Sequence, residues 1–223
     1  MNLEPIWGKF KETAQLSATQ LNQFVKYAEL IQDWNDRVNL TSILENQKII
    51  DLHFLDSLSL ASFMDLTIKL TLTDVGSGAG FPAIPLKIKY PNLRIILIEV
   101  NLKKIEFLQA VIDELGLENI EIYDQDWRTF LRKTNDHVDL FCARASLKPL
   151  ELLRVFKAGC IYRQAKLVYW AADHWDECEL GKAGRVPDNL ARTEWGYLVG
   201  DKTRKLICWK LNLNPENLDP SEN

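Results

Sequence analysis

The sequence predicts an α/β protein with a seven-stranded, mostly parallel sheet and an N-terminal helical extension. From residue 70 onward, strand-like apolar runs alternate with helical patterns, as in consecutive βαβ units. The last two strand-like runs are joined only by Gly200-Asp201-Lys202, a hairpin turn that indicates an antiparallel edge. The apolar periodicity before this region is helical. We therefore expect a helical cap over residues 1–66, a sheet domain over 67–211 and a flexible tail over 212–223.

The cap is predicted to contain two main helices. Ser17 and Gln20 form a capping box ahead of an apolar stripe that runs at helical spacing from Leu21 to Trp34. A second stripe of the same kind runs from Ile49 to Ala61. Stripes of this kind are packing surfaces in most proteins, so we expect the cap to lie against the sheet domain.

The elements of the sheet domain follow one another in regular order. Strands are expected at 70–75, 94–99, 119–123, 138–142, 166–171, 193–199 and 204–211, and helices at 82–90, 102–115, 127–133 and 147–157. Gly116 is placed to end the second of these helices. Such alternation indicates a parallel sheet with helices on both faces.

The composition is that of an ordinary globular protein. The 223 residues are 47% hydrophobic and 26% charged, enough to bury a substantial core. The four cysteines form no Cys-x-x-Cys pair and there are only three histidines, so we expect no metal site. Cys142 and Cys208 lie in strand-like runs and are expected as buried thiols. We therefore expect a cytoplasmic protein, without a signal segment or a membrane span.

The charge is unevenly distributed along the chain. The net charge of −4 argues against nonspecific nucleic-acid binding. Residues 144–210, however, hold 13 Lys and Arg against 8 Asp and Glu. This basic half could face phosphate groups, or it could be an ordinary solvated surface.

The most informative segment is the glycine-rich turn after the first expected strand. Asp74 is followed by Gly76, Gly78 and Gly80, which let a ligand approach the backbone closely. Pro82 then opens the next helix. A dinucleotide-binding loop needs its third glycine at the sixth position, which is Phe81 here. The pattern Asp-x-Gly-x-Gly-x-Gly is instead typical of class I methyltransferases that bind S-adenosyl-L-methionine, although a purely structural turn is the alternative.

An acid at the end of the second strand supports an adenosine-type cofactor. Glu99 lies about 20 residues past the glycines, where such folds place a carboxylate for the ribose hydroxyls. It could accept two hydrogen bonds from the ribose diol. The structural alternative is a salt bridge with Lys103 or Lys104.

Further candidates follow the third and fourth strands, because ligands bind beyond the carboxyl ends of parallel strands. Asp126 could accept from the adenine amino group or be a solvated turn residue, and Phe81 or Trp127 could lie on the adenine ring. Arg144 is a permanent cation at the end of a buried strand. It could bind the cofactor carboxylate or a substrate phosphate, or form a structural ion pair.

Four segments carry a resemblance to a known family: residues 34–42 (Trp-Asn-Asp-Arg-Val-Asn-Leu-Thr-Ser), 53–57 (His-Phe-Leu-Asp-Ser), 74–86 around the glycines, and Arg144-Ala145. Across residues 15–210 the chain resembles the bacterial 16S ribosomal RNA (guanine-N7)-methyltransferase G family, also called glucose-inhibited division protein B. The resemblance implies a Rossmann-like class I fold, S-adenosyl-L-methionine as cofactor, and the 16S rRNA of the small ribosomal subunit as partner. It also implies a cytoplasmic enzyme, which we expect to be a monomer.

By position, the family's cofactor contacts fall on Gly76, Phe81, Trp127, Arg128 and Arg144. The chain departs from the family pattern twice. Asp126-Trp127-Arg128 stands where members often have Arg-x-Glu, which favours a backbone contact there. Ala171-Ala172 stands where members typically have Lys-Gly, which removes a substrate or phosphate contact.

Guanine N7 has a free lone pair and no proton to lose, so its methylation needs positioning rather than a general base. The candidates for positioning are Arg144, His53 and Asp56. The last two lie three residues apart and could border the substrate entrance or tie the cap to the sheet. Arg204 and Lys205 could contact the rRNA backbone or protect a sheet edge. The alternatives are methylation of a small molecule or protein, or a degenerate RNA- or nucleotide-binding protein without activity.

Overall fold

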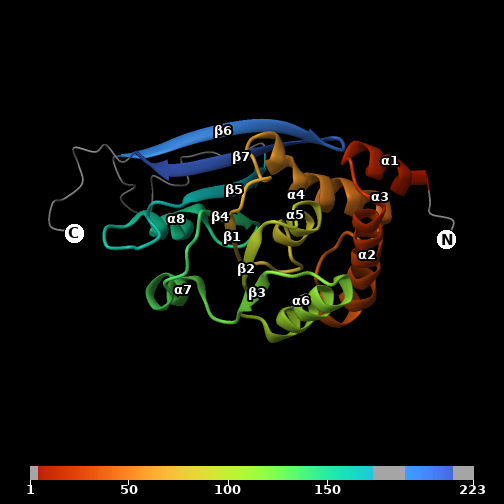
Figure 1. The fold of residues 1–223 in the computed structure, drawn as a ribbon, viewed down its shortest axis with the longest axis horizontal. Helices are drawn as coiled ribbons and strands as arrows, with labels where there is room; N and C mark the ends of the chain where they lie inside the picture. Colours follow the sequence, from red (N-terminus) through yellow and green to blue (C-terminus); the bar gives the residue numbers. More distant parts are fainter. Residues whose placement is uncertain (1–4, 173–188, 213–223) are drawn as a thin grey trace.

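The computed structural model describes residues 5–172 and 189–212, and it is built on one seven-stranded sheet (Figure 1). The strands are β1 (Thr71–Val75), β2 (Arg94–Ile98), β3 (Ile120–Tyr123), β4 (Leu140–Arg144), β5 (Lys166–Ala172), β6 (Leu190–Val199) and β7 (Lys202–Leu211). Their order in the sheet is β3-β2-β1-β4-β5-β7-β6. Strands β1 to β5 are parallel, and β7 is antiparallel to both of its neighbours. The predicted seven-stranded, mostly parallel sheet is confirmed.

The helices of the cap are α1 (Pro5–Thr13), α2 (Ala18–Val38), α3 (Asn46–Ile49) and α4 (Asp56–Leu58), with a π-helical turn at Ile50–Leu55 and a 3₁₀ turn at Ser59–Ser62. The sheet domain adds α5 (Ala83–Lys89), α6 (Leu102–Leu115), α7 (Trp127–Lys133) and α8 (Pro149–Leu152), followed by a 3₁₀ turn at Leu153–Phe156. The capping box of Ser17 and Gln20 opens α2 as predicted. Gly116 ends α6 in the left-handed conformation, also as predicted.

Several expected elements differ in detail from the structure, and two of these differences concern β4 and α8. The strand expected at 138–142 begins at Leu140 and runs on to Arg144, because its ladder starts opposite Leu72 of β1 and continues opposite Trp170 of β5. The helix expected at 147–157 is a short α-helix followed by a 3₁₀ turn. The first difference matters for function, since it makes Arg144 the last ladder residue of its strand.

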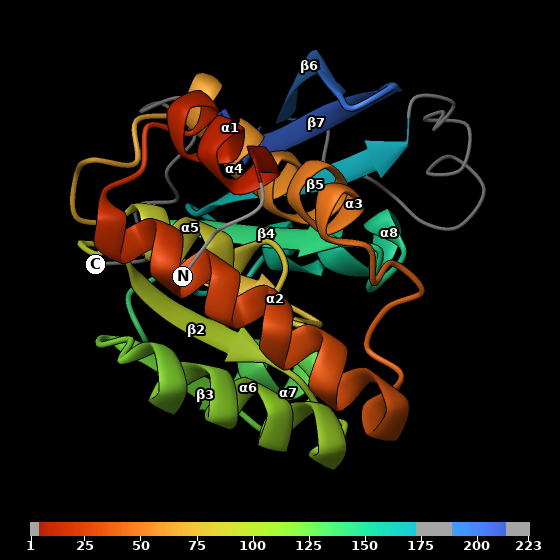
Figure 2. The ribbon, with the colours of Figure 1, turned by 90° about the vertical axis from the view of Figure 1, so that its right-hand side faces the viewer.

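The core consists of two hydrophobic clusters, one on each face of the sheet. Leu72, Leu97 and Leu140 belong to the cluster that also contains the buried side chains of α1, α2, α5 and α6. Phe141 and Ile98 belong to the cluster that contains the buried side chains of α7 and α8. Figures 1 and 2 show α7 and α8 on one side of the sheet and the cap, α5 and α6 on the other. The cap therefore shares a core with the sheet.

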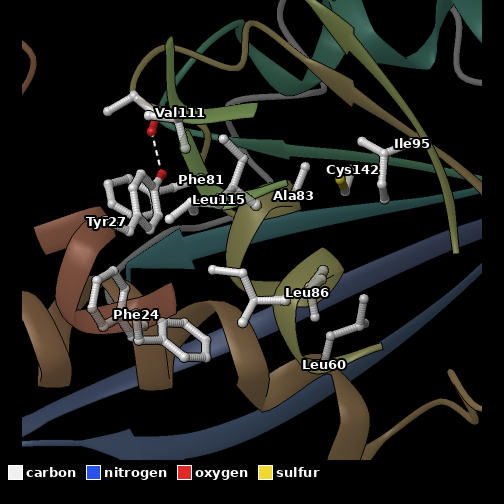
Figure 3. Close-up of a cluster of buried hydrophobic side chains, with 14 of the residues drawn as sticks. Phe24, Tyr27, Leu60, Phe81, Ala83, Leu86, Ile95, Val111, Leu115 and Cys142 are labelled. Atoms are coloured by element: carbon white, nitrogen blue, oxygen red, sulfur yellow. Dashed lines mark hydrogen bonds between the residues drawn. The ribbon is translucent and has the colours of Figure 1, made fainter. Parts of the chain in front are cut away.

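The cap also contacts the glycine-rich turn directly. Phe24 and Tyr27 of α2 lie in the same buried group as Phe81 (Figure 3). The hydroxyl of Tyr27 donates a hydrogen bond to the carbonyl of Ala79 within the turn. Cys142 and Cys208 are buried free thiols, as predicted.

Some expectations fall outside the part of the chain that can be described. The predicted tail is one of them, since residues 213–223 are not described. Within 5–172 and 189–212, no helix combines the length and apolar character that crossing a membrane requires.

Candidate functional site

A cavity of about 250 Å³ opens at the carboxyl ends of β1 and β2. We call it the strand-end cavity; it is lined by Val75, Gly76, Ile98, Glu99, Val100, Asp126, Trp127, Arg128, Leu147 and Glu151. Five of the residues that the sequence nominated for the cofactor are in this lining: Gly76, Glu99, Asp126, Trp127 and Arg128. The rule that ligands bind beyond parallel strand ends thus leads to a real cavity.

The turn that forms one wall of this cavity requires glycine for two reasons. Gly76, Gly78 and Gly80 have φ angles of 73°, 59° and 90°, which side chains rarely adopt. A Cβ at Gly76 would also lie 2.5 Å from the Cβ of Ser146, and one at Gly80 would lie 2.5 Å from Cδ1 of Ile84. At Gly78 the nearest atom to such a Cβ would be 3.9 Å away, so there the backbone is open.

Glu99 is bound to backbone amides. Its Oε2 accepts from the amide of Gly78 at 2.8 Å, and its Oε1 accepts from the amides of Val100 and Asn101 at 2.9 and 3.0 Å. The predicted alternative, an ion pair with a neighbouring lysine, is absent from the described contacts of Glu99. Because an ionised carboxylate offers about four acceptor positions, Glu99 can accept one further hydrogen bond as it lies. The two-fold contact with a ribose diol would require it to release an amide.

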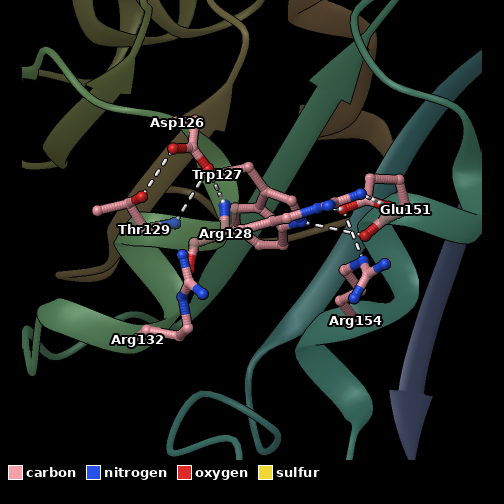
Figure 4. A network of polar contacts seen from close by, with 7 residues as sticks. All are labelled: Asp126, Trp127, Arg128, Thr129, Arg132, Glu151 and Arg154. Atoms are coloured by element: carbon pink, nitrogen blue, oxygen red, sulfur yellow. Dashed lines mark hydrogen bonds and ion pairs between the residues drawn. The ribbon is translucent and has the colours of Figure 1, made fainter.

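The side chains of Asp126, Trp127 and Arg128 are occupied by protein partners (Figure 4). Asp126 caps α7 by accepting from the amides of Arg128 and Thr129, and the hydroxyl of Thr129, which also donates to it, is the main cause of its lowered pKa. The indole of Trp127 donates to the carbonyl of Glu151. Arg128 makes a bidentate contact with the carboxylate of Glu151 at 2.6 and 3.0 Å. A backbone contact with a ligand is therefore more natural here than a side-chain contact.

Phe81 lies away from this cavity. Its ring is stacked on His53, with centroids 4.4 Å apart, and the guanidinium of Arg144 lies 4.7 Å from the ring centroid. The predicted stacking of an adenine on Phe81 would have to displace these neighbours. Trp127 lines the strand-end cavity and is the ring that the structure offers for such a contact.

A second cavity, of about 350 Å³, lies between the cap and the ends of β4 and β5. We call it the cap cavity; it is lined by Ile43, Leu52, His53, Asp56, Arg144, Ala145, Tyr169, Trp170, Ala171, Ala172, Lys202 and Arg204. The segment after β4 contributes to both cavities, since Ala145 lines the cap cavity and Leu147 lines the strand-end cavity. The three positioning candidates His53, Asp56 and Arg144 all meet here.

Arg144 is held by the cap. Its Nη1 donates to Oδ2 of Asp56 at 2.9 Å and to the carbonyl of Leu52 at 3.3 Å. The side chain of Asp56 is 3% exposed, and its other oxygen accepts from the hydroxyl of Tyr197 at 2.8 Å. The indole of Trp170 donates to the carbonyl of Asp56. Asp56 thus ties the cap to the sheet, as one of the two predicted alternatives stated. It also lines the cap cavity, and the other alternative, a place at the substrate entrance, stays a prediction.

The same network fixes the protonation of His53. A guanidinium can only donate, so Nδ1 of His53 must accept from Nη2 of Arg144, 3.2 Å away. The ring proton is then on Nε2, which donates to the hydroxyl of Thr41 at 3.0 Å. Burial, and after it the nearby Arg144 cation, lowers the pKa of His53 to about 3. His53 is therefore neutral with both nitrogens engaged, and it is no candidate for a general base.

Asp74, the acid before the glycines, is also a structural group. It is completely buried, and burial raises its pKa to about 8. The thiol of Cys142 lies 3.8 Å from its Oδ1. Neither Tyr27 nor Tyr197 was predicted as a site residue, although the hydroxyl of Tyr27 binds the glycine-rich turn and that of Tyr197 binds Asp56. Tyr27 lies at helical spacing from Phe24 and Ile31, and this pattern could have indicated that its side chain is buried. No sequence pattern indicated the role of Tyr197.

Comparisons with known proteins agree with this architecture. A family model described as rRNA small subunit methyltransferase G matches residues 20–179. Proteins named "Ribosomal RNA small subunit methyltransferase G" match this chain in Geobacillus kaustophilus (strain HTA426), at 42% identity over 132 residues, and in Bacillus licheniformis (strain ATCC 14580), at 40% over 149 residues. These alignments cover 58% and 65% of this chain, and 56% and 62% of the relatives, so the chain spans little more than half the length of the relatives it matches.

A solved structure shows the same fold at low sequence identity. The chain is similar to a SAM-dependent methyltransferase from Aquifex aeolicus, with a TM-score of 0.54 and 18% identity. The match covers 75% of this chain and 95% of the other. The predicted class I, Rossmann-like methyltransferase fold is confirmed.

Proposed function

Because the chain belongs to the rRNA small subunit methyltransferase G family, we propose that it transfers the methyl group of S-adenosyl-L-methionine to N7 of a guanine in 16S rRNA. The observation that carries the proposal is the family match over residues 20–179 on a methyltransferase fold. The enzyme would act as a monomer in the cytoplasm, with the small ribosomal subunit or its rRNA as partner.

The strand-end cavity fits the cofactor. Gly76 and Gly78 leave backbone exposed beside the carboxylate of Glu99, which retains one acceptor position for a ribose hydroxyl. Trp127 supplies a ring at the other wall. Arg144 has five N–H donors, of which three are used in its bonds to the cap and His53. The remaining donors suit the cofactor carboxylate or a substrate phosphate.

When bound, S-adenosyl-L-methionine supplies a methyl group on a sulfonium. Guanine N7 carries a lone pair and no proton, so accepting this methyl group would release a neutral thioether and would need no general base. The protein must therefore orient the base and exclude water, which accounts for a site whose histidine is neutral and fully hydrogen-bonded. A donor aimed at N7 would block the nucleophile, so the arginines are expected to bind O6 or phosphate.

The test uses small ribosomal subunits and naked 16S rRNA from cells that lack their own enzyme. Each is incubated with the protein and radiolabelled S-adenosyl-L-methionine, and the label is mapped. We expect label on N7 of one guanine. Intact cofactor binding without label on either RNA would contradict the proposal and favour a small-molecule or protein substrate. Loss of cofactor binding as well would favour a degenerate binding protein.

A further inference from the structure

The cap cavity contains two cations that the described part of the protein leaves uncompensated. Arg144 is neutralised by Asp56, whose two carboxylate oxygens accept from Arg144 and from Tyr197. Arg204 and Lys202 line the same cavity, and neither has an ion-pair partner among the described residues. With His53 neutral, the cavity keeps a surplus of two positive charges.

One buried hydrogen-bond donor of Arg204 has no partner among the described residues. Its Nε is buried and has no acceptor within residues 5–172 and 189–212. A buried donor without a partner is costly, and more so when the group is charged. The guanidinium is close enough to His53 to contribute to the lowering of its pKa. An acceptor supplied from outside the chain would remove this cost.

The neighbouring strand leaves room for such an acceptor. Arg204 of β7 is paired in register with Ala172 of β5, and Ala171 and Ala172 both line the cavity. Their methyl groups add little volume beside the guanidinium. The alanines that depart from the family pattern are thus part of the wall of a cationic cavity.

From these observations we propose that the cap cavity binds a phosphodiester group of the substrate RNA, through Arg204 and Lys202, with Ala171 and Ala172 leaving space for it. The inference deepens the proposed function and rests on it. The phosphate would be held beside Arg144, in a cavity to which the segment after β4 contributes as it does to the strand-end cavity. This phosphate contact would position the RNA strand, while the base itself is recognised elsewhere.

Lys205 provides a matched control. It is adjacent to Arg204 on β7, but its register partner is Ala171, and it forms an ion pair with Glu194 at 3.2 Å instead of lining the cap cavity. Arg204→Gln and Lys205→Gln each remove one positive charge from the same strand. Arg204→Lys keeps the charge and loses the fork of donors.

The experiment measures RNA affinity at several salt concentrations, together with cofactor affinity and thermal stability. For Arg204→Gln we expect about tenfold weaker binding of 16S rRNA, and a slope of log K against log [salt] reduced by about 0.7, which corresponds to the loss of one phosphate contact. Cofactor affinity should be unchanged, and Arg204→Lys should recover part of the slope. For Lys205→Gln we expect no change in slope.

An unchanged slope in folded Arg204→Gln would overturn the inference, as would an equal change in the Lys205→Gln control. Competition by inorganic phosphate tests whether the cap cavity binds any free anion or requires RNA. We expect no competition at phosphate concentrations 10-fold below those at which ionic strength alone displaces the RNA. A wild type that binds RNA with the Arg204-dependent slope but labels no guanine would refute the proposed function and leave this inference standing.

Discussion

The strand-end cavity and the cap cavity lie on the same edge of the sheet and are built in opposite ways. Most residues that line the first end a strand or lie within five residues after one, so their positions follow from the order of strands along the chain. The second is assembled from the cap, β4, β5 and β7, and its central ion pair joins residues 88 positions apart. The order of strands in the fold therefore positions the strand-end cavity, whereas long-range packing creates the cap cavity.

The two cavities also differ in how their charges are balanced. Arg128 at the strand-end cavity is paired with Glu151, which also binds Arg154. In the cap cavity Arg144 is balanced by a buried acid, but Arg204 and Lys202 are not balanced within the described chain. The first environment suits a cofactor with a cationic sulfonium, and the second suits a polyanion.

The largest expected effect tests the ion pair that supports the cap cavity. Arg144→Ala removes the cation that pairs with Asp56 and leaves its carboxylate buried without a counter-charge. This change should lower the free energy of unfolding by about 3–5 kcal/mol. Arg128→Ala breaks an ion pair whose arginine is 57% exposed, and should cost less than about 1 kcal/mol. Urea unfolding of both variants measures the difference. Equal losses would mean that the two arginines play the same structural role, against the comparison.

The surroundings of Arg144 show which features of the site could be predicted from the sequence and which could not. The alternation of elements predicted the seven strands, and the glycines and the strand-end rule led to the strand-end cavity. That the partner of Arg144 is Asp56 could not be predicted, because it depends on how the cap packs on the sheet. A π-helical turn at Ile50–Leu55 has no pattern that distinguishes it from an α-helix, although it contains His53 and leads into Asp56. Local rules predict what local geometry determines, and the cap cavity is not local.

The next effect tests the glycine-rich turn that forms one wall of the strand-end cavity. Gly76→Ala would force a left-handed φ and place a Cβ 2.5 Å from that of Ser146. We expect a loss of stability of about 2–4 kcal/mol, and at least tenfold weaker cofactor binding. Gly116→Ala is the control, since its φ is also positive but open space surrounds it, and it should cost only about 1–2 kcal/mol.

Adding Ser146→Gly to Gly76→Ala separates strain from collision. The second change removes the side chain that the new Cβ would meet, so stability should return to about the level of the Gly116→Ala control. A double variant as unstable as Gly76→Ala alone would show that the segment after β4 does not press on the turn.

A smaller effect distinguishes the cap cavity by its pH dependence. The pKa of His53 is about 3 in the folded protein against about 6.5 unfolded, so between these values only the unfolded chain binds the proton. Stability contributed by neutral His53 is therefore present above pH 6.5 and is lost as the pH falls toward 3. Buried Asp74 has a raised pKa of about 8, so its contribution to stability is instead lost as the pH rises from about 4 to 8.

The measurement is thus the difference between wild type and His53→Gln, in which the contribution of Asp74 cancels. The variant should be less stable than wild type at pH 7.5, and the gap should narrow by about 1 kcal/mol between pH 6 and 5. A gap that is constant across this range would show that His53 titrates normally and is not enclosed by Arg144 and Thr41.

A change in ligand binding addresses the contrast between the cavities most directly. Glu99→Gln keeps the size of the side chain but loses the charge. Its single carbonyl oxygen accepts about two hydrogen bonds, whereas the carboxylate accepts from three backbone amides and keeps a position for a ribose hydroxyl. We expect cofactor binding to weaken about tenfold, which is about 1.4 kcal/mol, with RNA affinity and its salt dependence unchanged. Arg204→Gln should show the reverse pattern. Glu121→Gln, which alters an exposed acid paired with Arg94 away from both cavities, is the control for the loss of one negative charge. If Glu99→Gln and Arg204→Gln each weakened both ligands equally, the two cavities would have to be regarded as one continuous site, because separate sites that bind different ligands must respond separately.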